Sequence, residues 1–184
     1  MRQSSPAGAS RPVRFVYIGG LAWQKGVHTL VEAFGGVRGN AELWIAGDES
    51  FDPAYVARLR AIAAPAVRFL GRLSRAAVWE TLAQVDAVVV PTLLYETFSF
   101  IVSEAFAAGV PVIASRLGPL TDRVRDGVDG LLVPPGDVAA WRRAMQRLVD
   151  EPDLLSTLRA GIQPVETMDA HAAAIEEVYK NAVR

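Results

Sequence analysis

The sequence predicts a single α/β domain, a Rossmann-like fold in which helices cover both faces of a doubly wound parallel sheet of about six strands. Three observations lead to this prediction. Short runs of apolar, β-branched residues alternate with helical patterns along most of the 184 residues. Most of these runs are apolar at nearly every position, as in strands that are buried on both faces. Glycines and helix-capping residues stand where one element should give way to the next.

Each apolar run predicts one strand, and each helical pattern between two runs predicts one helix. The expected strands, in chain order, are residues 13–18, 43–46, 67–70, 87–91, 111–114 and 131–133. The expected helices are residues 27–34, 54–63, 76–84, 99–108, 120–125 and 138–148, followed by two more over residues 152–160 and 168–183. Residues that favour a helix start precede these helices at Gly26, Asp52, Ser74 and Asp137, and glycines that favour a helix end stand at Gly35 and Gly109.

Charge and composition exclude several classes of function. The formal net charge is -1 and the pI is near 6.1, so the charge balance gives no reason to expect nucleic acid or an anionic membrane as a partner. The chain has no cysteine, which excludes disulfides, thiolate metal sites and cysteine catalysis, and which fits a cytoplasmic protein. No apolar run is long enough to cross a bilayer as a transmembrane segment.

The first eleven residues, MRQSSPAGASR, differ in composition from the rest of the chain. They contain no apolar run of the kind that a signal peptide needs. Their Ser, Pro, Ala and Gly content predicts a disordered tail or the remnant of an interdomain linker. The remaining residues, 12–184, are predicted to form one domain.

The predicted topology also indicates where a ligand would bind. In a doubly wound sheet, ligands lie outside the carboxyl ends of the strands, so the segments that follow the strands carry the function. These segments are residues 19–26, 47–53, 71–74, 92–98 and 115–120.

The first of these segments is rich in glycine and contains one cation. Gly19 and Gly20 allow the backbone to approach a ligand closely, and the helix that follows Gly26 directs unpaired N–H groups at an anion. Lys25 adds a positive charge beside them. The segment matches neither the Walker loop nor the dinucleotide-binding glycine pattern. On these residues alone, a glycine-rich turn with a solvated lysine is better supported than a ligand site.

A second candidate site follows the most hydrophobic strand. Glu96 lies in the loop, and the N–H groups of residues 97–100 (Thr97, Phe98, Ser99 and Phe100) begin the next helix, where they could bind a phosphate. Glu104 has apolar neighbours at helical spacing, which predicts that it faces inward and needs a polar partner. That partner could be backbone amides, an arginine, or the hydroxyl groups of a sugar, and the sequence leaves these alternatives open.

Glu96 and Glu104, with seven residues between them, resemble the E-x7-E motif of a large family of retaining glycosyltransferases of the GT-B type. Four segments are similar to that family in order and spacing: YIGGLAWQKGVHTLVEAF, VRFLGRLS, DAVVVPTLLYETFSFIVSEAFAAGVPVIAS and VRDGVDGLLVPPGD. Each segment alone is a weak match, but the four together are highly specific. The resemblance implies that this chain is the nucleotide-sugar-binding, C-terminal half of a GT-B enzyme.

The resemblance also implies a role for each motif residue. Lys25 would pair with the donor diphosphate, and Glu104 would bind the ribose hydroxyls. Glu96 would be the catalytic residue, holding the donor sugar and the distal phosphate together with the amides of Phe98, Ser99 and Phe100. The family needs no essential metal and no cofactor, and a helix dipole and positive charge stabilise the departing nucleoside diphosphate.

The sequence departs from the family pattern at three places. The arginine that binds the diphosphate in the family is replaced by Gly20, and Arg72 or Arg116 would have to substitute for it. A motif glycine is replaced by Ser99, and the G-G-x-P-E segment is altered over residues 118–122. The first departure, at Gly20, lowers the expected affinity for phosphate.

The family architecture implies a partner that these residues do not contain. A GT-B active site lies between two Rossmann-like domains, and the N-terminal one binds the acceptor. We therefore expect that this chain requires an acceptor-binding domain, on the same chain or a separate one, and is inactive in sugar transfer without it. Such a domain could also bring a cytoplasmic protein to a membrane.

Two alternatives to a glycosyltransferase remain. One is a GT-B relative with other chemistry, such as a nucleotide-sugar epimerase or a phosphorylase, although the sequence has only two histidines, His28 and His171, for the extra acid–base groups of an epimerase. The other is a degenerate, non-catalytic binding module, which the loss of the arginine at Gly20 would fit. Base, sugar and acceptor are not readable from the sequence.

Overall fold

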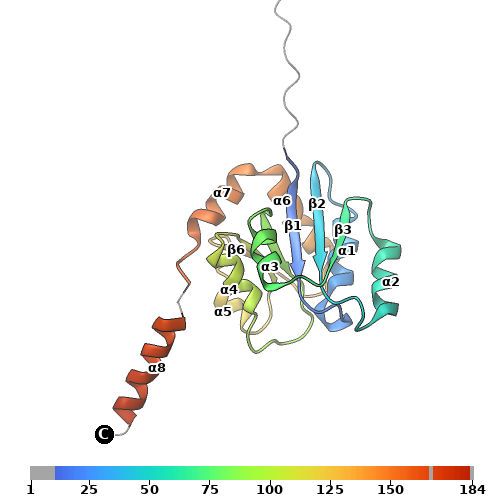
Figure 1. Ribbon diagram of the computed structural model, residues 1–184. Coiled ribbons are helices and arrows are strands. Elements are labelled where there is room, and N and C mark those ends of the chain that lie inside the picture. The colour runs from blue at the N-terminus through green and yellow to red at the C-terminus, as the bar shows by residue number, and fades with distance from the viewer. Residues whose placement is uncertain (1–10, 166–167, 183–184) are drawn as a thin grey trace, which may run out of the picture.

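The computed structural model describes residues 11–165 and 168–182 and contains the predicted six-stranded parallel sheet (Figure 1). The strand order is β3-β2-β1-β4-β5-β6, the order of the dinucleotide-binding fold. The strands are β1 (Val13–Ile18), β2 (Ala41–Ala46), β3 (Val67–Gly71), β4 (Ala87–Val90), β5 (Val112–Ser115) and β6 (Gly130–Val133). All six predicted strands are confirmed, with ends that differ from the prediction by up to two residues.

The largest strand difference is at the start of β2, which begins before its apolar run. Glu42 lies opposite Arg14 of β1 and forms ion pairs with Arg14 at 3.3 Å and with Arg68 of β3 at 2.8 Å. Charged side chains of opposite sign on adjacent strands stabilise the ladder there. The strand is therefore longer than its apolar residues predict.

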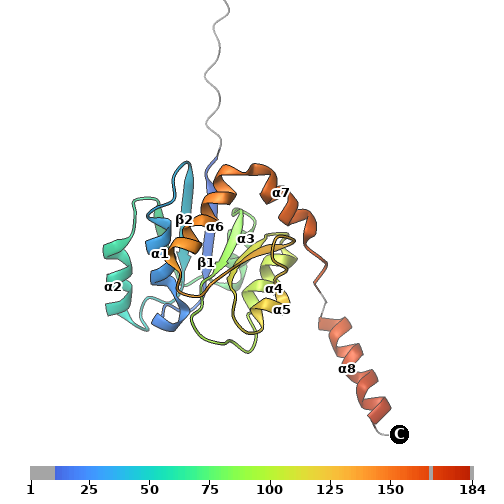
Figure 2. The ribbon, with the colours of Figure 1, turned by 180° about the vertical axis from the view of Figure 1, so that it is seen from behind.

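Helices cover both faces of the sheet (Figure 2). They are α1 (Val27–Phe34), α2 (Pro53–Ile62), α3 (Arg75–Leu82), α4 (Phe100–Ala107), α5 (Leu120–Arg123), α6 (Val138–Asp150), α7 (Pro152–Gly161) and α8 (Met168–Ala182), with a 3-10 turn, η1, over Trp23–Lys25. Alternate strand residues face two separate cores. Phe15 and Val89 pack with α1, α2, α6 and α7, whereas Val16 and Val88 pack with α3, α4 and α5. This arrangement confirms the doubly wound class.

The predicted N-terminal caps are present. The side chains of Asp52, Ser74 and Asp137 accept hydrogen bonds from the backbone N–H groups of Tyr55, Ala77 and Ala140 at 2.9, 3.2 and 2.9 Å. The prediction for α5 was too long, because Val124 adopts an extended conformation and ends the helix at Arg123.

Residues from the two ends of the sheet-and-helix body, Arg11 and Arg159, meet at the amino ends of the strands, away from the expected ligand site. The buried carboxylate of Asp86, just before β4, accepts hydrogen bonds from Arg11 at 2.7 Å and from Arg159 of α7 at 2.8 Å. The tail predicted over residues 1–11 lies outside the described residues except for Arg11. Beyond α7, helix α8 extends away from the body in both views (Figures 1 and 2). No helix in the described ranges is both long enough and apolar enough to span a membrane.

Candidate functional site

Two adjoining pockets lie at the carboxyl edge of the sheet, where the strand order reverses between β1 and β4. The first is lined by Lys25, Glu96, Ser99 and by residues at the ends of β1 and β4. The second is lined by the ends of β1 and β2 and by Arg72, Leu73 and Val78 near the start of α3. Ile18, Gly19 and Gly20 line both pockets. This is the position that the fold class predicts for a ligand.

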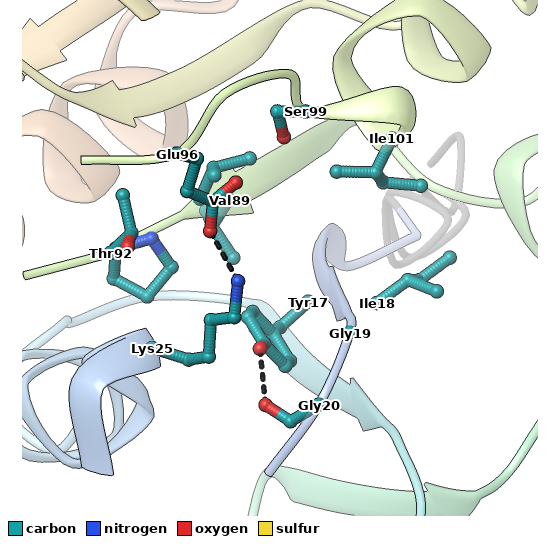
Figure 3. A pocket seen from close by; sticks show the side chains of 12 residues that line it. Tyr17, Ile18, Gly19, Gly20, Lys25, Val89, Thr92, Glu96, Ser99 and Ile101 are labelled. Atoms are coloured by element: carbon teal, nitrogen blue, oxygen red, sulfur yellow. Dashed lines mark hydrogen bonds and ion pairs between the residues drawn. The ribbon is translucent and has the colours of Figure 1, made fainter. Parts of the chain in front are cut away.

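The first pocket brings together two predicted site residues that are 71 positions apart. Lys25 Nζ lies 2.6 Å from Glu96 Oε1, and both side chains are partly buried (Figure 3). The loop after β1 reaches the loop after β4 through a backbone hydrogen bond from Leu93 N–H to the Gln24 carbonyl at 2.9 Å. The pair places a cation and a carboxylate at one point on the pocket wall.

Gly26 makes this close approach possible. It ends η1 with φ of 71°, in the left-handed region that favours glycine, and a Cβ there would lie 2.0 Å from the Pro91 carbonyl oxygen. Any larger residue would push the turn that carries Lys25 away from the loop that carries Glu96. The sequence predicted only an entry turn at this position.

The buried side chain of Tyr17 holds the segment that contains Gly19 and Gly20 in place. Its hydroxyl group donates a hydrogen bond to the Gly20 carbonyl at 2.7 Å. Burial raises the pKa of Tyr17 far above its usual value, and the Glu96 carboxylate raises it further, so the hydroxyl stays protonated. A Cβ at Gly20 would have nothing within 4 Å, so this position faces open space beside both pockets. Tyr17 was not among the predicted site residues because in the sequence it is one more apolar strand residue.

The predicted phosphate-binding segment is placed at the start of α4. Ser99 is the N-cap residue of α4, lines the first pocket, and makes no capping hydrogen bond with its side chain. Thr97, Phe98 and Phe100 are exposed, and the Phe98 and Phe100 rings meet edge to face. Unpaired N–H groups at a helix N-terminus can bind an anion. Ser99 thus brings the start of α4 to the first pocket, and the binding of a phosphate there stays a prediction.

The side chain of Glu104 is only 17% exposed and has a polar partner, as predicted, but it does not lie on the core-facing side of α4. Its helical neighbour Phe100 is 73% exposed, and the core-facing side of α4 is formed by Val102 and Ala105 instead. Glu104 is half-buried beside α3, and Arg75 Nη1 donates to its Oε1 at 2.8 Å. Of the open alternatives, an arginine is thus its partner within the chain. Glu104 lines neither pocket.

The two arginines considered as substitutes at Gly20 differ in position. Arg72 lines the second pocket next to Gly19 and Gly20 and lies 3.6 Å from Asp48. Arg116 instead pairs with Asp126 and with the carbonyl oxygen of Leu132. The geometry therefore favours Arg72 as the nearer cation.

Arg123 of α5 contacts Ser99, which lines the first pocket, and it was not predicted as a site residue. Its Nη1 donates to the Ser99 carbonyl at 3.0 Å, its Nη2 donates to Ser103 Oγ, and its guanidinium lies over the Phe98 ring, 3.9 Å from the centroid. The contact joins residues that are 20 or more positions apart, so no local pattern in the sequence could reveal it.

Histidines do not contribute to the pockets in the described part of the chain. His28 stacks on Trp23 and its Nδ1 lies 2.9 Å from the Tyr55 hydroxyl, while the side chain of His171 is outside the described residues. Burial lowers the pKa of His28. Among the described residues, no three His, Asp or Glu side chains gather in a way that could hold a metal ion.

Comparison with known proteins adds the following findings. Residues 12–151 match the family model described as glycosyl transferases group 1. A glycogen synthase from Mycobacterium tuberculosis (strain CDC 1551 / Oshkosh) is 32% identical over 145 residues, which are 77% of this chain and 35% of that protein. A D-inositol 3-phosphate glycosyltransferase from Salinispora arenicola is 38% identical over 101 residues, 53% of this chain and 22% of that protein.

Solved structures match the fold over most of its length. The sucrose-phosphate synthase from Thermosynechococcus elongatus has a TM-score of 0.80 and 28% identity, and the match covers 96% of this chain and 47% of that one. Anabaena HepE in complex with UDP and glucose has a TM-score of 0.83 and 20% identity, and covers 92% of this chain and 49% of that one. This chain thus spans about half of the structures it matches.

Proposed function

The chain belongs to the glycosyl transferases group 1 family, and from this membership we propose that it is the donor-binding half of a retaining glycosyltransferase. It would bind a nucleoside diphosphate sugar and deliver the sugar, of the hexose type, to an acceptor held by a second domain. The observation that carries this proposal is the pairing of Lys25 with Glu96 at 2.6 Å beside the N-terminus of α4, at the switch point of the sheet.

The two pockets suggest how the donor would lie. The first pocket offers Lys25, Glu96 and the start of α4, which suits a diphosphate and a sugar. The second pocket offers the ends of β1 and β2 together with Leu73 and Val78, a flatter and more apolar surface that suits a nucleoside. Gly19 and Gly20 lie between them, where the backbone can pass close to the ligand.

Each residue would then have a separate task in transfer. When the bond between the anomeric carbon and the diphosphate oxygen breaks, negative charge grows on the diphosphate. Lys25 and the N–H groups of Ser99 and Phe100 would stabilise that charge, because they are held in place before the reaction. Glu96 would accept hydrogen bonds from the sugar hydroxyls and so orient the sugar toward the acceptor. Glu104 would bind the ribose hydroxyls, either with its second carboxylate oxygen or after its ion pair with Arg75 breaks.

Transfer would require a second domain. The match covers 35% of the glycogen synthase and about half of each solved structure. The acceptor-binding side of the cleft would therefore come from a domain that corresponds to the unmatched part of those proteins. Holding two substrates in the right orientation in a closed site lowers the barrier by about 7–11 kcal/mol. The donor-binding domain alone cannot provide this effect, because it does not hold the acceptor.

A degenerate binding module is the second candidate function. Gly20 removes one cation, and the remaining cation of the first pocket is already paired with Glu96. Such a module would bind nucleotides weakly and would not support transfer with any partner domain.

A transfer assay separates these two functions. We would combine this chain with an N-terminal domain from a related enzyme, fused or as a second chain, and measure movement of radiolabelled sugar from a panel of donors to a set of acceptors. The proposal predicts turnover only when both domains are present, and turnover that persists with chelator. Turnover by this chain alone would contradict the half-enzyme proposal, and loss with chelator would contradict metal-independent transfer. Diphosphate binding without turnover in any combination would favour the binding module.

A further inference from the structure

The charged side chains that line the proposed donor site are already paired with one another. Lys25 pairs with Glu96 in the first pocket, and Arg72 faces Asp48 in the second. A nucleoside diphosphate brings at least two negative charges into this site. Positive charge that no carboxylate neutralises would therefore strengthen its binding.

Arg123 is a cation of this kind next to the first pocket. Its guanidinium holds the segment that leads into α4 at several points: the Ser99 carbonyl at 3.0 Å, the Ser103 hydroxyl, and the face of the Phe98 ring at 3.9 Å. Ser99 itself lines the pocket and is buried. One side chain thus contacts the N-cap residue and residues on both sides of it in the sequence, at the start of α4.

No carboxylate pairs with Arg123 within the described structure. Its hydrogen-bond partners are a carbonyl and a hydroxyl group, and burial lowers its pKa. By contrast, Arg14, which is also half-buried, is paired with Glu42. A guanidinium remains protonated at neutral pH, so the charge of Arg123 adds to the positive end of the α4 dipole. The charge of Arg123 and the partial positive charge at the start of α4 together favour the binding of an anion there.

We propose that Arg123 is a positioning residue of the donor site and supplies the positive charge that Gly20 lacks. It acts through Ser99: it orients the N–H groups at the start of α4 toward the diphosphate and adds long-range attraction without contacting the ligand. This inference rests on the proposed function, because it takes the first pocket to be the diphosphate site.

The test compares three variants by isothermal titration. Arg123→Met removes both the charge and the hydrogen bonds, Arg123→Lys retains the charge alone, and Arg143→Met removes a solvent-exposed charge on α6 as the matched control. Each is titrated with whichever of UDP, GDP, ADP and dTDP binds the unchanged chain most tightly, and with the corresponding nucleoside, at several NaCl concentrations. Far-UV circular dichroism and thermal unfolding establish that each variant is folded.

We expect Arg123→Met to weaken diphosphate binding about tenfold, the effect of a unit charge about 10 Å away at an effective dielectric constant of about 20. Nucleoside affinity should change little, and diphosphate affinity should depend less on NaCl, because salt screens the lost charge. Arg123→Lys should fall between Arg123→Met and the unchanged chain, and Arg143→Met should match the unchanged chain.

Equal losses for diphosphate and nucleoside, or an unaltered salt dependence, would show that Arg123 only stabilises the loop and would overturn the inference. If Arg123→Met does not fold, Arg123→Lys and Ser103→Ala decide the question, since each must weaken the diphosphate more than the nucleoside. Failure of the unchanged chain to bind any of the four diphosphates would instead contradict the proposed function, and the inference with it.

Discussion

Restoring an arginine at position 20 should tighten diphosphate binding. Gly20 lines both pockets, is exposed, and has no atom within 4 Å of the place where a Cβ would lie. Its φ is outside the left-handed region, so a larger residue fits without backbone strain. A guanidinium there would reach the point where the two pockets meet.

The magnitude follows from two opposing effects. A hydrogen bond to a charged group contributes about 1.5–3 kcal/mol, whereas ordering an exposed arginine side chain costs about 1–2 kcal/mol. The net gain of about 1 kcal/mol corresponds to about a fivefold lower Kd. Titration of Gly20→Arg with the preferred nucleoside diphosphate and with its nucleoside measures this gain, and Gly20→Gln serves as the control of similar length without charge. An unchanged Kd in folded Gly20→Arg, or an equal gain for the nucleoside, would refute the placement of the diphosphate beside Gly20.

The remaining predictions concern Lys25, Glu104 and Gly26. Lys25→Ala should raise the Kd of the diphosphate about tenfold and that of the nucleoside far less, because the lost group is a charged hydrogen-bond donor; equal losses in titration would place Lys25 outside the phosphate site. Glu104→Ala should weaken nucleoside and diphosphate alike by about 1.5–3 kcal/mol if it binds the ribose, and Arg75→Gln should not reproduce that loss. An unchanged nucleoside affinity in folded Glu104→Ala would exclude the ribose role. Gly26→Ala should lower the free energy of unfolding by about 2–4 kcal/mol, because left-handed strain adds to the clash with Pro91. The control, Gly109→Ala, has the same φ of 71° but open space around it, so it should lose only the strain of about 1–2 kcal/mol in urea unfolding. Equal losses at the two glycines would mean that the contact at Gly26 is not needed.

The sheet could be predicted from the sequence because its strands are buried on both faces. Runs such as residues 87–90 are apolar at every position, and in an α/β domain a run this short and this apolar is typical of a central parallel strand. The start of β2 could not be predicted in this way, since Glu42 belongs to the strand through its cross-strand partners Arg14 and Arg68. Cross-strand pairs depend on register, which the pattern of one strand does not contain.

The candidate site also contains residues that could be predicted from the sequence and partners that could not. Lys25 and Glu96 follow β1 and β4, and a doubly wound order makes these strands neighbours, so their proximity could be expected before the structure. The partners Arg75 and Arg123 could not, because each reaches α4 from another helix through a long side chain. The environment of Glu104 was predicted only in part, because helical spacing identifies an apolar side, and that side of α4 is exposed around Phe100.

The most direct test is whether this chain binds a nucleoside diphosphate sugar at the carboxyl edge of its sheet. Thermal unfolding with UDP, GDP, ADP and dTDP and their sugars measures this, because a ligand that binds only the folded state at a hundredfold excess over Kd stabilises it by about 2.7 kcal/mol. For a domain of this size that gain raises Tm by about 5–10 °C. We expect such a rise for at least one diphosphate, a much smaller rise for its nucleoside, and a clearly smaller difference between them in Lys25→Ala. No rise with any of these ligands, or an undiminished difference in Lys25→Ala, would contradict the proposed donor site.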